Sequence, residues 1–232
     1  MKKNEILKYV SNFCNVKISR LLNIPPSSMP IVLLWITNKC NLKCKMCNQW
    51  KSDKGILSEE LSTQEWCSIV KSCAKMKTSI ISITGGEPFL HPGIFTIIKN
   101  INDNGINCHI CTNGTLLNKK TINRLAASPP DTISVSFDGH VPNIHNELRG
   151  KDCFNTVVDN IKLLKQEIPS IKISINHLTC RRNYKNICKM IWFAKRLGVD
   201  QLNIQPIHYN LQHKNKLFKK SDNLFFTEND LP

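Results

Sequence analysis

The sequence alternates between two hydrophobic periodicities, and this alternation limits the possible folds more than any other feature. Six short segments have the composition of β-strands. Between them lie segments whose apolar residues recur every three or four positions, as on one face of a helix. Regular alternation of strands and helices predicts a parallel sheet with right-handed crossover connections. The strand-like segments are 31–37, 79–84, 106–112, 132–137, 171–178 and 201–205.

Residues that begin and end helices lie between these segments. Ser62 and Glu65 have the spacing of a capping box, in which two side chains satisfy backbone N–H groups of the first helical turn. Further helices are expected to begin near Pro92, Asn118, Asp152 and Asn183, and the last is expected to end at Gly198. The chain therefore consists largely of repeated strand–helix units.

Polar residues occupy every second position of several strand-like segments. Ser134, Ser136 and Asp138, for example, alternate with apolar residues. A parallel strand covered on both faces is nearly all apolar, and the interior of a closed barrel is packed with branched apolar side chains. The alternation therefore predicts an α/β fold, a partial, open (βα)6 barrel of the TIM type with parallel strands around a polar cavity. Its chemistry is expected at the carboxyl ends of the strands.

Three cysteines, Cys40, Cys44 and Cys47, follow the first strand-like segment with C-x3-C-x2-C spacing. They could hold three irons of a four-iron, four-sulfur cluster and leave the fourth open, whereas a closed electron-transfer cluster normally has four cysteine ligands. Half of a zinc site is an alternative, although structural zinc takes four ligands and no second pair lies nearby. Disulfides are not favoured, because the N-terminus lacks the apolar stretch of a secretory signal. The spacing alone leaves iron–sulfur and zinc open.

Every further strand-like segment also ends in, or is followed by, a polar or glycine-containing motif. These motifs are Gly85-Gly86-Glu87-Pro88, Thr112-Asn113-Gly114, Ser136-Phe137-Asp138-Gly139, Asn176 and Gln205-Pro206. Each motif alone is typical of a turn or a strand end. One at the same end of every strand predicts a shared site.

The composition argues against several classes of protein. The chain has 232 residues, enough for one large domain or two small ones, and its apolar runs are far shorter than a membrane-spanning helix requires. The net charge is +15, but the lysines are dispersed and no basic stripe contains interleaved aromatic residues, so a nucleic-acid partner is not favoured. Eleven cysteines without a secretory signal predict a reducing, cytoplasmic location. Cys108 and Cys111 are expected to pack on opposite faces of a strand rather than to form a second metal site.

With these motifs considered together, the chain from about Ile31 to Pro206 resembles the radical S-adenosylmethionine (radical SAM) superfamily. The resemblance is strongest to the branch of peptide- and cofactor-modifying enzymes that often carry SPASM or twitch extensions. It implies a [4Fe-4S] cluster bound by Cys40, Cys44 and Cys47. It also implies cleavage of S-adenosylmethionine (SAM) to a 5′-deoxyadenosyl radical, which takes hydrogen from a peptide, cofactor-precursor or metabolite substrate. The enzyme would be an oxidoreductase or a transferase and would receive electrons from a donor such as flavodoxin or ferredoxin.

Two other functions remain open. One is a glycyl-radical activating enzyme, which acts on a partner protein. The other is a noncatalytic iron–sulfur or zinc protein that binds a nucleotide. The segment Leu148-Arg149-Gly150 is similar to one in the peptide- and cofactor-modifying branch. It therefore favours a radical SAM enzyme that modifies a peptide, cofactor precursor or metabolite over a glycyl-radical activating enzyme.

The resemblance also implies cofactor-binding positions. In the family, the segment after the second strand meets the SAM amino group, polar residues of the fourth strand contact the methionyl and ribose parts, and the end of the sixth strand flanks the adenine. The corresponding positions here are Gly85, Gly86, Glu87, Pro88, Asn113, Ser136, Asp138, Asn176 and Gln205. Arg149 is either a ligand of the SAM carboxylate or a surface arginine of the loop before Asp152. Met46 stands where the family commonly has an aromatic residue, and no residue is assigned to the second hydrogen transfer.

Three regions are expected along the chain. Residues 1–30 form an amphipathic helical lead-in, which is expected to cap the bottom of the barrel rather than to lie on a membrane surface. Residues 31–206 form the radical SAM core. Residues 207–232 are a basic tail, either a natural end or the start of a longer C-terminal region. The extensions of related enzymes are rich in cysteine, and none follows Cys188 in this sequence.

Overall fold

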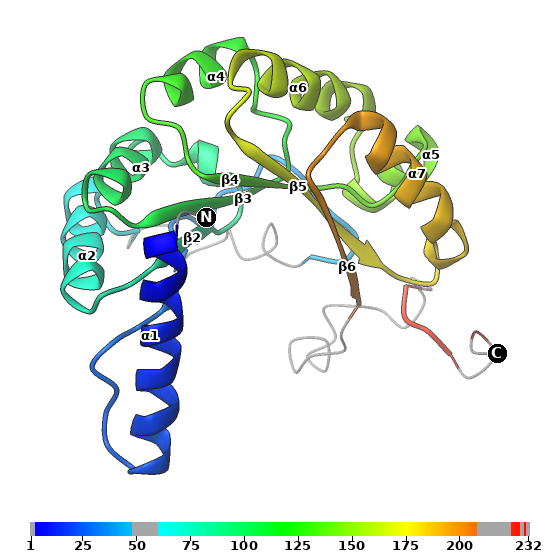
Figure 1. The fold of residues 1–232 in the computed structure, drawn as a ribbon. Helices are drawn as coiled ribbons and strands as arrows, with labels where there is room; N and C mark the ends of the chain where they lie inside the picture. Colours follow the sequence, from blue (N-terminus) through cyan, green and yellow to red (C-terminus); the bar gives the residue numbers. More distant parts are fainter. Residues whose placement is uncertain (1–2, 48–59, 208–223, 228–229, 231–232) are drawn as a thin grey trace.

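The structure, a computed structural model, describes residues 3–47, 60–207, 224–227 and 230. Six strands form one sheet in sequential order, and every neighbouring pair is parallel. The strands are β1 (Ile31–Trp35), β2 (Ile80–Thr84), β3 (Asn107–Thr112), β4 (Thr132–Ser136), β5 (Lys172–Thr179) and β6 (Gln201–Pro206). In the described part of the chain β1 and β6 are not paired with each other, so the barrel is open (Figure 1). The predicted fold class is confirmed.

Helices cover the convex face of this curved sheet, and the concave face is turned away from them (Figure 1). The helices after β1 are α2 (Thr63–Lys75), α3 (Ile94–Asp103), α4 (Lys119–Ala126), α5 (Pro142–Arg149), α6 (Phe154–Glu167) and α7 (Ile187–Leu197). Two short 3-10 helices, η3 (Pro88–Leu90) and η4 (Tyr184–Asn186), lie in the connections. All five crossovers between these strands thus run over one face, as right-handed connections require.

Most helix ends agree with the predictions. The capping box of Ser62 and Glu65 is formed, and the Asn118 side chain accepts a hydrogen bond from the Thr121 N–H. Gly198 ends α7 with a φ of 71°, a left-handed conformation that glycine adopts without strain. Two starts differ by a few residues: α3 begins after Gly93 rather than at Pro92, and η4 separates Asn183 from α7.

The two faces of the sheet have the predicted difference in polarity. Ile81, Ile133, Val135 and Ile173 are fully buried in the core between sheet and helices. The residues between them, such as Ser134, face the concave side. Cys108 is buried in the core and Cys111 hydrogen-bonds on the concave side, so these two cysteines do lie on opposite faces. The helices therefore bury the apolar half of β2 to β5 and leave a lumen with many polar side chains, whereas Ile31, Leu33 and Trp35 of β1 are exposed on the face away from the core.

Helix α5 was not predicted, because the segment before Asp152 was expected to be a loop. Pro142 lies at its first turn and Gly150 ends it with a φ of 67°. His145 and Leu148 are fully buried. The helix is short and mostly polar, so its stability comes from tertiary packing rather than from a hydrophobic period that the sequence displays.

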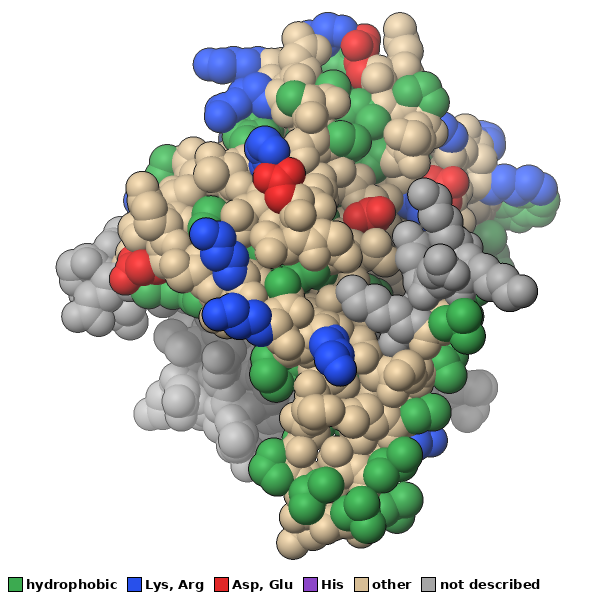
Figure 2. Space-filling view, turned by 60° about the vertical axis from the view of Figure 1, so that its left-hand side comes forward, with side chains coloured by type: hydrophobic (Ala, Val, Ile, Leu, Met, Phe, Trp, Pro, Cys, Tyr) green, Lys and Arg blue, Asp and Glu red, His purple; other side chains and the backbone are tan. Residues whose placement is uncertain are grey.

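The first helix, α1 (Lys3–Leu21), is attached at the amino-terminal end of β2 and extends away from the sheet (Figure 1). The Asn12 amide donates hydrogen bonds to the Lys77 carbonyl (2.7 Å) and the Ser79 hydroxyl (3.0 Å). Hydrophobic side chains gather on the surface of this extension (Figure 2), where Leu21 is 84% exposed. No described helix is long and apolar enough to cross a bilayer. The basic segment of the predicted tail, 214–220, lies outside the described residues.

Candidate functional site

The cysteine loop leaves the carboxyl end of β1 and crosses the edge of the barrel. Cys44 is buried, and Cys40 and Cys47 are half-buried. Burial raises the pKa of the Cys40 and Cys44 thiols. The neighbouring Cys44 and Cys47 raise the pKa of Cys40 further, which places the three sulfurs within electrostatic reach of one another. Thiols with raised pKa values lose their protons readily only when a nearby cation or a bound metal stabilises the thiolate.

Two glycines allow the segment after β2 to approach the start of this loop. The Gly86 N–H donates to the Thr37 carbonyl and the Glu87 N–H donates to the Lys39 carbonyl, both at 2.7 Å. A Cβ atom on Gly86 would overlap the carbonyl oxygen of Lys39, and one on Gly85, whose φ is 146°, would overlap that of Thr37. The backbone next to Cys40 is therefore held by a contact that only glycine permits.

The Glu87 carboxylate joins the same segment to the end of β3. It is fully buried and accepts hydrogen bonds from the Thr112 hydroxyl (2.7 Å), the Asn113 N–H (2.8 Å) and the Phe89 N–H (3.3 Å). Burial raises the pKa of Glu87 to about 7, although these hydrogen bonds oppose the rise. Glu87 is thus a buried structural carboxyl rather than a residue open to a ligand.

Asn113 continues this network into the cysteine loop. Its amide donates to the Asn41 side chain at 2.8 Å, and its carbonyl oxygen accepts from the Thr115 N–H and hydroxyl. The Asn41 amide in turn donates to the Thr115 hydroxyl at 2.8 Å. Because Asn41 follows Cys40 directly, Asn113 orients the cysteine loop.

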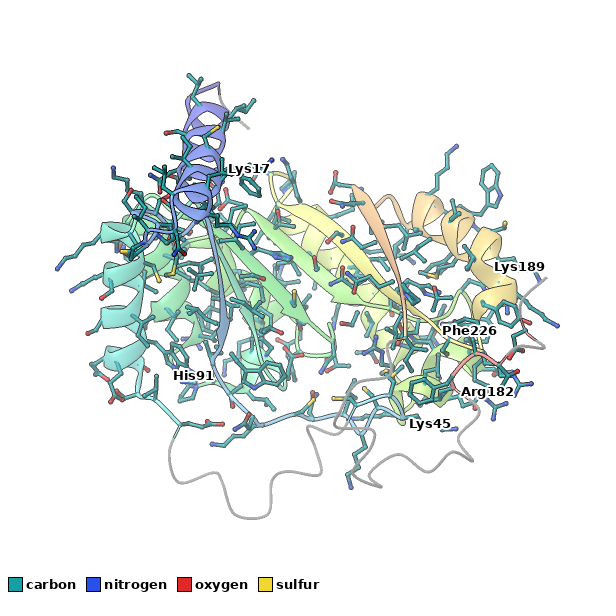
Figure 3. All side chains as sticks on the ribbon, turned by 90° about the horizontal axis from the view of Figure 1, so that it is seen from below. Lys17, Lys45, His91, Arg182, Lys189 and Phe226 are labelled. Atoms are coloured by element: carbon teal, nitrogen blue, oxygen red, sulfur yellow. The ribbon has the colours of Figure 1, made fainter. Side chains whose placement is uncertain are left out.

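Helix α5 forms the other support of the cysteine loop. The Lys45 N–H donates to the Leu148 carbonyl (2.9 Å), and the Lys45 ammonium pairs with Glu147 (3.1 Å). The Arg182 guanidinium approaches the same Glu147 carboxylate at 3.6 Å, and Figure 3 shows Lys45 and Arg182 close together at this end of the barrel. The loop is therefore bound to α5 by both backbone and side-chain contacts.

Arg149, at the end of α5, lies under the cysteine loop. Its side chain is only 11% exposed, and its Nη2 lies 2.6 Å from Oδ2 of the fully buried Asp138. Its Nη1 donates to the Cys44 sulfur at 3.8 Å. Burial alone would lower the pKa of Arg149, but Asp138 and Cys44 outweigh this effect and raise it. The interpretation of Arg149 as a surface residue of a loop is wrong, because the unpredicted helix buries it.

Five of the residues expected to contact SAM line one cavity of about 250 Å³ beside the cysteine loop. They are Ser136, Asp138, Arg149, Asn176 and Gln205. Met46, inside the cysteine loop, and two unpredicted residues, His177 and Leu178, complete the lining. The register of the sheet explains the grouping, since Ser136 pairs with Asn176 and Leu178 pairs with Gln205.

The other expected positions do not line this cavity. Gly85, Gly86, Glu87 and Asn113 support the cysteine loop through the contacts above, and Pro88 begins η3. His177 was not predicted as a site residue, because it occupies a position of β5 at which the alternation places an apolar residue. Its Nδ1 hydrogen-bonds the Phe137 carbonyl (3.1 Å), and its Nε2 is buried without a hydrogen-bond partner among the described residues.

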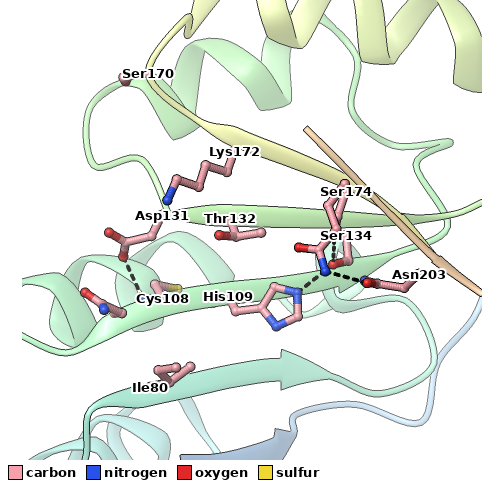
Figure 4. Close-up of a pocket in the computed structure, with 12 residues that line it drawn as sticks. Ile80, Cys108, His109, Asp131, Thr132, Ser134, Ser170, Lys172, Ser174 and Asn203 are labelled. Carbon is pink, nitrogen blue, oxygen red and sulfur yellow. Dashed lines mark hydrogen bonds between the residues drawn. The ribbon is translucent and has the colours of Figure 1, made fainter. Parts of the chain in front are cut away.

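A second cavity, of about 490 Å³, lies in the lumen toward the amino ends of the strands (Figure 4). Its central residue is His109, whose Nδ1 and Nε2 hydrogen-bond Ser82 (2.9 Å) and Ser134 (2.7 Å). Asn203 lines this cavity and donates to Asn176, which lines the cavity beside the cysteine loop (2.9 Å). The polar side chains thus continue along the lumen from one end of the barrel toward the other.

The donor set of the cysteine loop fits an iron–sulfur cluster. Three thiols lie in one partly buried loop, and a guanidinium next to Cys44 favours the thiolate. Among the described residues, no three histidine, cysteine or carboxylate side chains converge as they would around a single metal ion.

A family model described as the radical SAM superfamily matches residues 35–191. An AdoMet-dependent heme synthase of Methanosarcina barkeri is 30% identical over 177 residues, which are 75% of this chain and 50% of the relative. The mycofactocin maturase MftC of Mycobacterium tuberculosis is 28% identical over 73% of this chain and 43% of its own length. The chain thus spans half or less of the length of these curated relatives.

Solved structures share the fold at low sequence identity. Streptococcus suis SuiB bound to S-adenosylmethionine superposes with a TM-score of 0.72 and 21% identity, covering 85% of this chain and 45% of SuiB. The same protein bound to its precursor peptide SuiA gives a TM-score of 0.70 at 21% identity, covering 84% of this chain and 43% of SuiB.

Proposed function

Because the chain belongs to the radical SAM superfamily of enzymes, which use a [4Fe-4S] cluster and SAM, we propose that Cys40, Cys44 and Cys47 bind the cluster and that the cavity beside them binds SAM. The observation that carries this proposal is the position of the cavity. Met46 of the cysteine loop and residues from the ends of β4, β5 and β6 line the same space. When bound and reduced, the cluster supplies the electron that splits SAM into methionine and a 5′-deoxyadenosyl radical, which then takes hydrogen from the substrate.

The residues of the chain have separate roles in this proposal. Gly86, Glu87 and Asn113 hold the cysteine loop at the end of the barrel. Ser136, Asn176 and Gln205 supply hydrogen-bonding groups for SAM, and the lumen below them holds the substrate. Residues 31–206 then form the catalytic core, because the strands, the loop and both cavities lie within this range.

A peptide or a cofactor precursor is the proposed substrate class. Relatives of this chain include the maturase MftC and the heme synthase, and SuiB has been solved with a precursor peptide. The polar lumen supports such a substrate, since amide groups match its hydroxyl and amide side chains. These similarities favour this function over a glycyl-radical activating enzyme.

An electron donor of the flavodoxin or ferredoxin class is a further part of the proposal. Lys39, Lys43 and Lys45 are exposed around the cysteines, with Lys39 paired to Glu60 and Lys45 to Glu147, and exposed ammonium groups favour docking of an acidic partner. Cysteines outside the loop, such as Cys73, Cys108 and Cys153, are free thiols in the structure. Free thiols support a reducing compartment, consistent with the cytoplasm.

The proposal is tested by reconstituting the full chain with iron and sulfide without oxygen, reducing it with dithionite and measuring 5′-deoxyadenosine after SAM is added. We expect about four irons per chain and release of 5′-deoxyadenosine. Cys40→Ala should abolish the release, whereas Cys188→Ala, on the exposed side of α7, should retain it. Cleavage that survives Cys40→Ala, or a wild-type protein that binds only zinc, would contradict the proposal.

A further inference from the structure

We propose that Arg149 is a positioning residue that acts through Cys44: it donates a hydrogen bond to the Cys44 sulfur and thereby raises the reduction potential of the bound cluster. Asp138 holds the guanidinium in place for this purpose. The inference rests on the proposed function. It differs from the expected role of Arg149 as a ligand of the SAM carboxylate.

Two residues of the chain itself, Cys44 and Asp138, contact the Arg149 guanidinium. Nη1 lies 3.8 Å from the Cys44 sulfur and Nη2 lies 2.6 Å from Asp138 Oδ2, so one planar group contacts both residues. A guanidinium suits this arrangement because its donors are fixed in one plane and it remains charged when buried. Nε is buried without a hydrogen-bond partner among the described residues, so it is left for a ligand in the adjoining cavity.

Hydrogen bonds hold Asp138 in place, and this fixes the position of Arg149 as well. Oδ1 of Asp138 accepts from the Leu178 N–H (2.9 Å), and the main-chain carbonyl of Asp138 accepts from the Asn183 amide (2.9 Å). Both the side chain and the backbone of Asp138 are thus held by hydrogen bonds from neighbouring segments.

The peptide unit between Phe137 and Asp138 is held by two buried histidines. Its N–H donates to His145 Nδ1 at 3.3 Å, and its carbonyl accepts from His177 Nδ1 at 3.1 Å. His145 also stacks on the Phe137 ring with centroids 4.1 Å apart. These contacts come from α5 and β5, the two elements on either side of Asp138.

A donor at this sulfur favours the reduced cluster for two reasons. Reduction adds one negative charge to the cluster, and a nearby cation in a site with little water stabilises that charge. Hydrogen bonds to the ligand sulfurs also raise the reduction potential of iron–sulfur clusters. Asp138 offsets part of the positive charge, but the N–H donor remains directed at Cys44.

The test is a redox titration of the reconstituted cluster without SAM, followed by electron paramagnetic resonance. For Arg149→Gln we expect a lower midpoint potential, by about 59 mV, which corresponds to a tenfold change for a one-electron couple. The midpoint potential of Arg149→Lys should lie between those of the wild type and Arg149→Gln, because lysine keeps the positive charge but lacks the planar set of N–H donors. The double variant Arg149→Gln/Asp138→Asn removes both buried charges and should also have a lowered potential, which provides a folded variant if the single one is unstable.

The outcomes separate this inference from the proposed function. Variants that hold four irons and have the wild-type potential without SAM, but bind SAM more weakly, would overturn the inference and return Arg149 to the SAM carboxylate. A wild-type chain that assembles no four-iron cluster would overturn the proposed function and the inference together.

Discussion

Glu87, in the segment after β2, connects several segments of this site. Its carboxyl group accepts hydrogen bonds from the end of β3 and from η3, and its backbone N–H donates to the carbonyl of Lys39, next to the first cysteine. A buried carboxyl with three donors contributes to stability mainly because those donors would otherwise be unsatisfied. The buried Glu87 carboxyl group is therefore structural.

Glu87→Gln should lower the free energy of unfolding by about 1–3 kcal/mol, because the amide N–H₂ then faces a backbone or hydroxyl donor. The raised pKa adds a pH dependence. Between pH 4.5 and about 7, the unfolded chain loses the Glu87 proton while the folded chain retains it, so wild-type stability falls as pH rises. The slope from this group is at most about 1.4 kcal/mol per pH unit. Denaturant unfolding across this range should show a shallower slope for the variant, and equal slopes would contradict the assignment.

Gly86→Ala should displace the cysteine loop, because its Cβ would overlap the Lys39 and Asn38 carbonyl oxygens. We expect the variant to fold but to retain far fewer than four irons after reconstitution. Gly105→Ala is the matched control: Gly105 has a φ of 65° and open space around it, so the change costs about 1–2 kcal/mol of strain and leaves the loop in place. Equal iron content in the two variants would show that the close approach at Gly86 is dispensable.

At the scale of the elements, α5 is the helix that holds the cysteine loop against the barrel. The start of α6 was predicted at Asp152, but its first N–H groups are satisfied from α5. The Asn146 side chain accepts from the Cys153 and Phe154 N–H groups and donates to Asp152. One residue of a helix that the sequence did not reveal thus caps the next helix.

Asn146→Ala should leave the two N–H groups at the start of α6 without this acceptor and lower the free energy of unfolding by about 1–3 kcal/mol. Because α5 also carries Leu148 and Arg149, the variant should lose cluster iron faster during gel filtration. Asn118→Ala removes the side-chain cap of a different helix, α4. It should cost about 1 kcal/mol without faster loss of iron. Similar rates of loss in the two variants would argue against α5 as the support.

The elements also show why parts of the site were predictable and parts were not. Strand ends follow from period-two patterns and turn residues, so Ser136, Asn176 and Gln205 were found and do lie together. The roles of Arg149 and His177 depend on tertiary neighbours that no local pattern records. Helix α5 has no side-chain cap at Val141, and its apolar residues are few, so neither caps nor period indicated it.

At the scale of the whole molecule, the open sheet explains both the core and the lumen. Apolar residues on one face of each strand pack under the helices. Polar residues on the other face line two cavities, and a hydrogen bond connects Asn203 in the lining of one to Asn176 in the lining of the other. The alternation that predicted an open barrel therefore also predicted a wet interior. Residues 1–30 were predicted to cap the bottom of the barrel, and their helix α1 contacts the chain next to the amino end of β2 and lines neither cavity.

The central claim is that Cys40, Cys44 and Cys47 hold a four-iron cluster whose remaining iron is open to SAM. Electron paramagnetic resonance of the reduced, reconstituted wild-type chain, recorded before and after SAM is added, tests it most directly. A ligand at one iron changes the spectrum of the coupled cluster, so we predict a clear shift on addition of SAM and none on addition of adenosine. A reduced four-iron spectrum that SAM leaves unchanged would contradict the account.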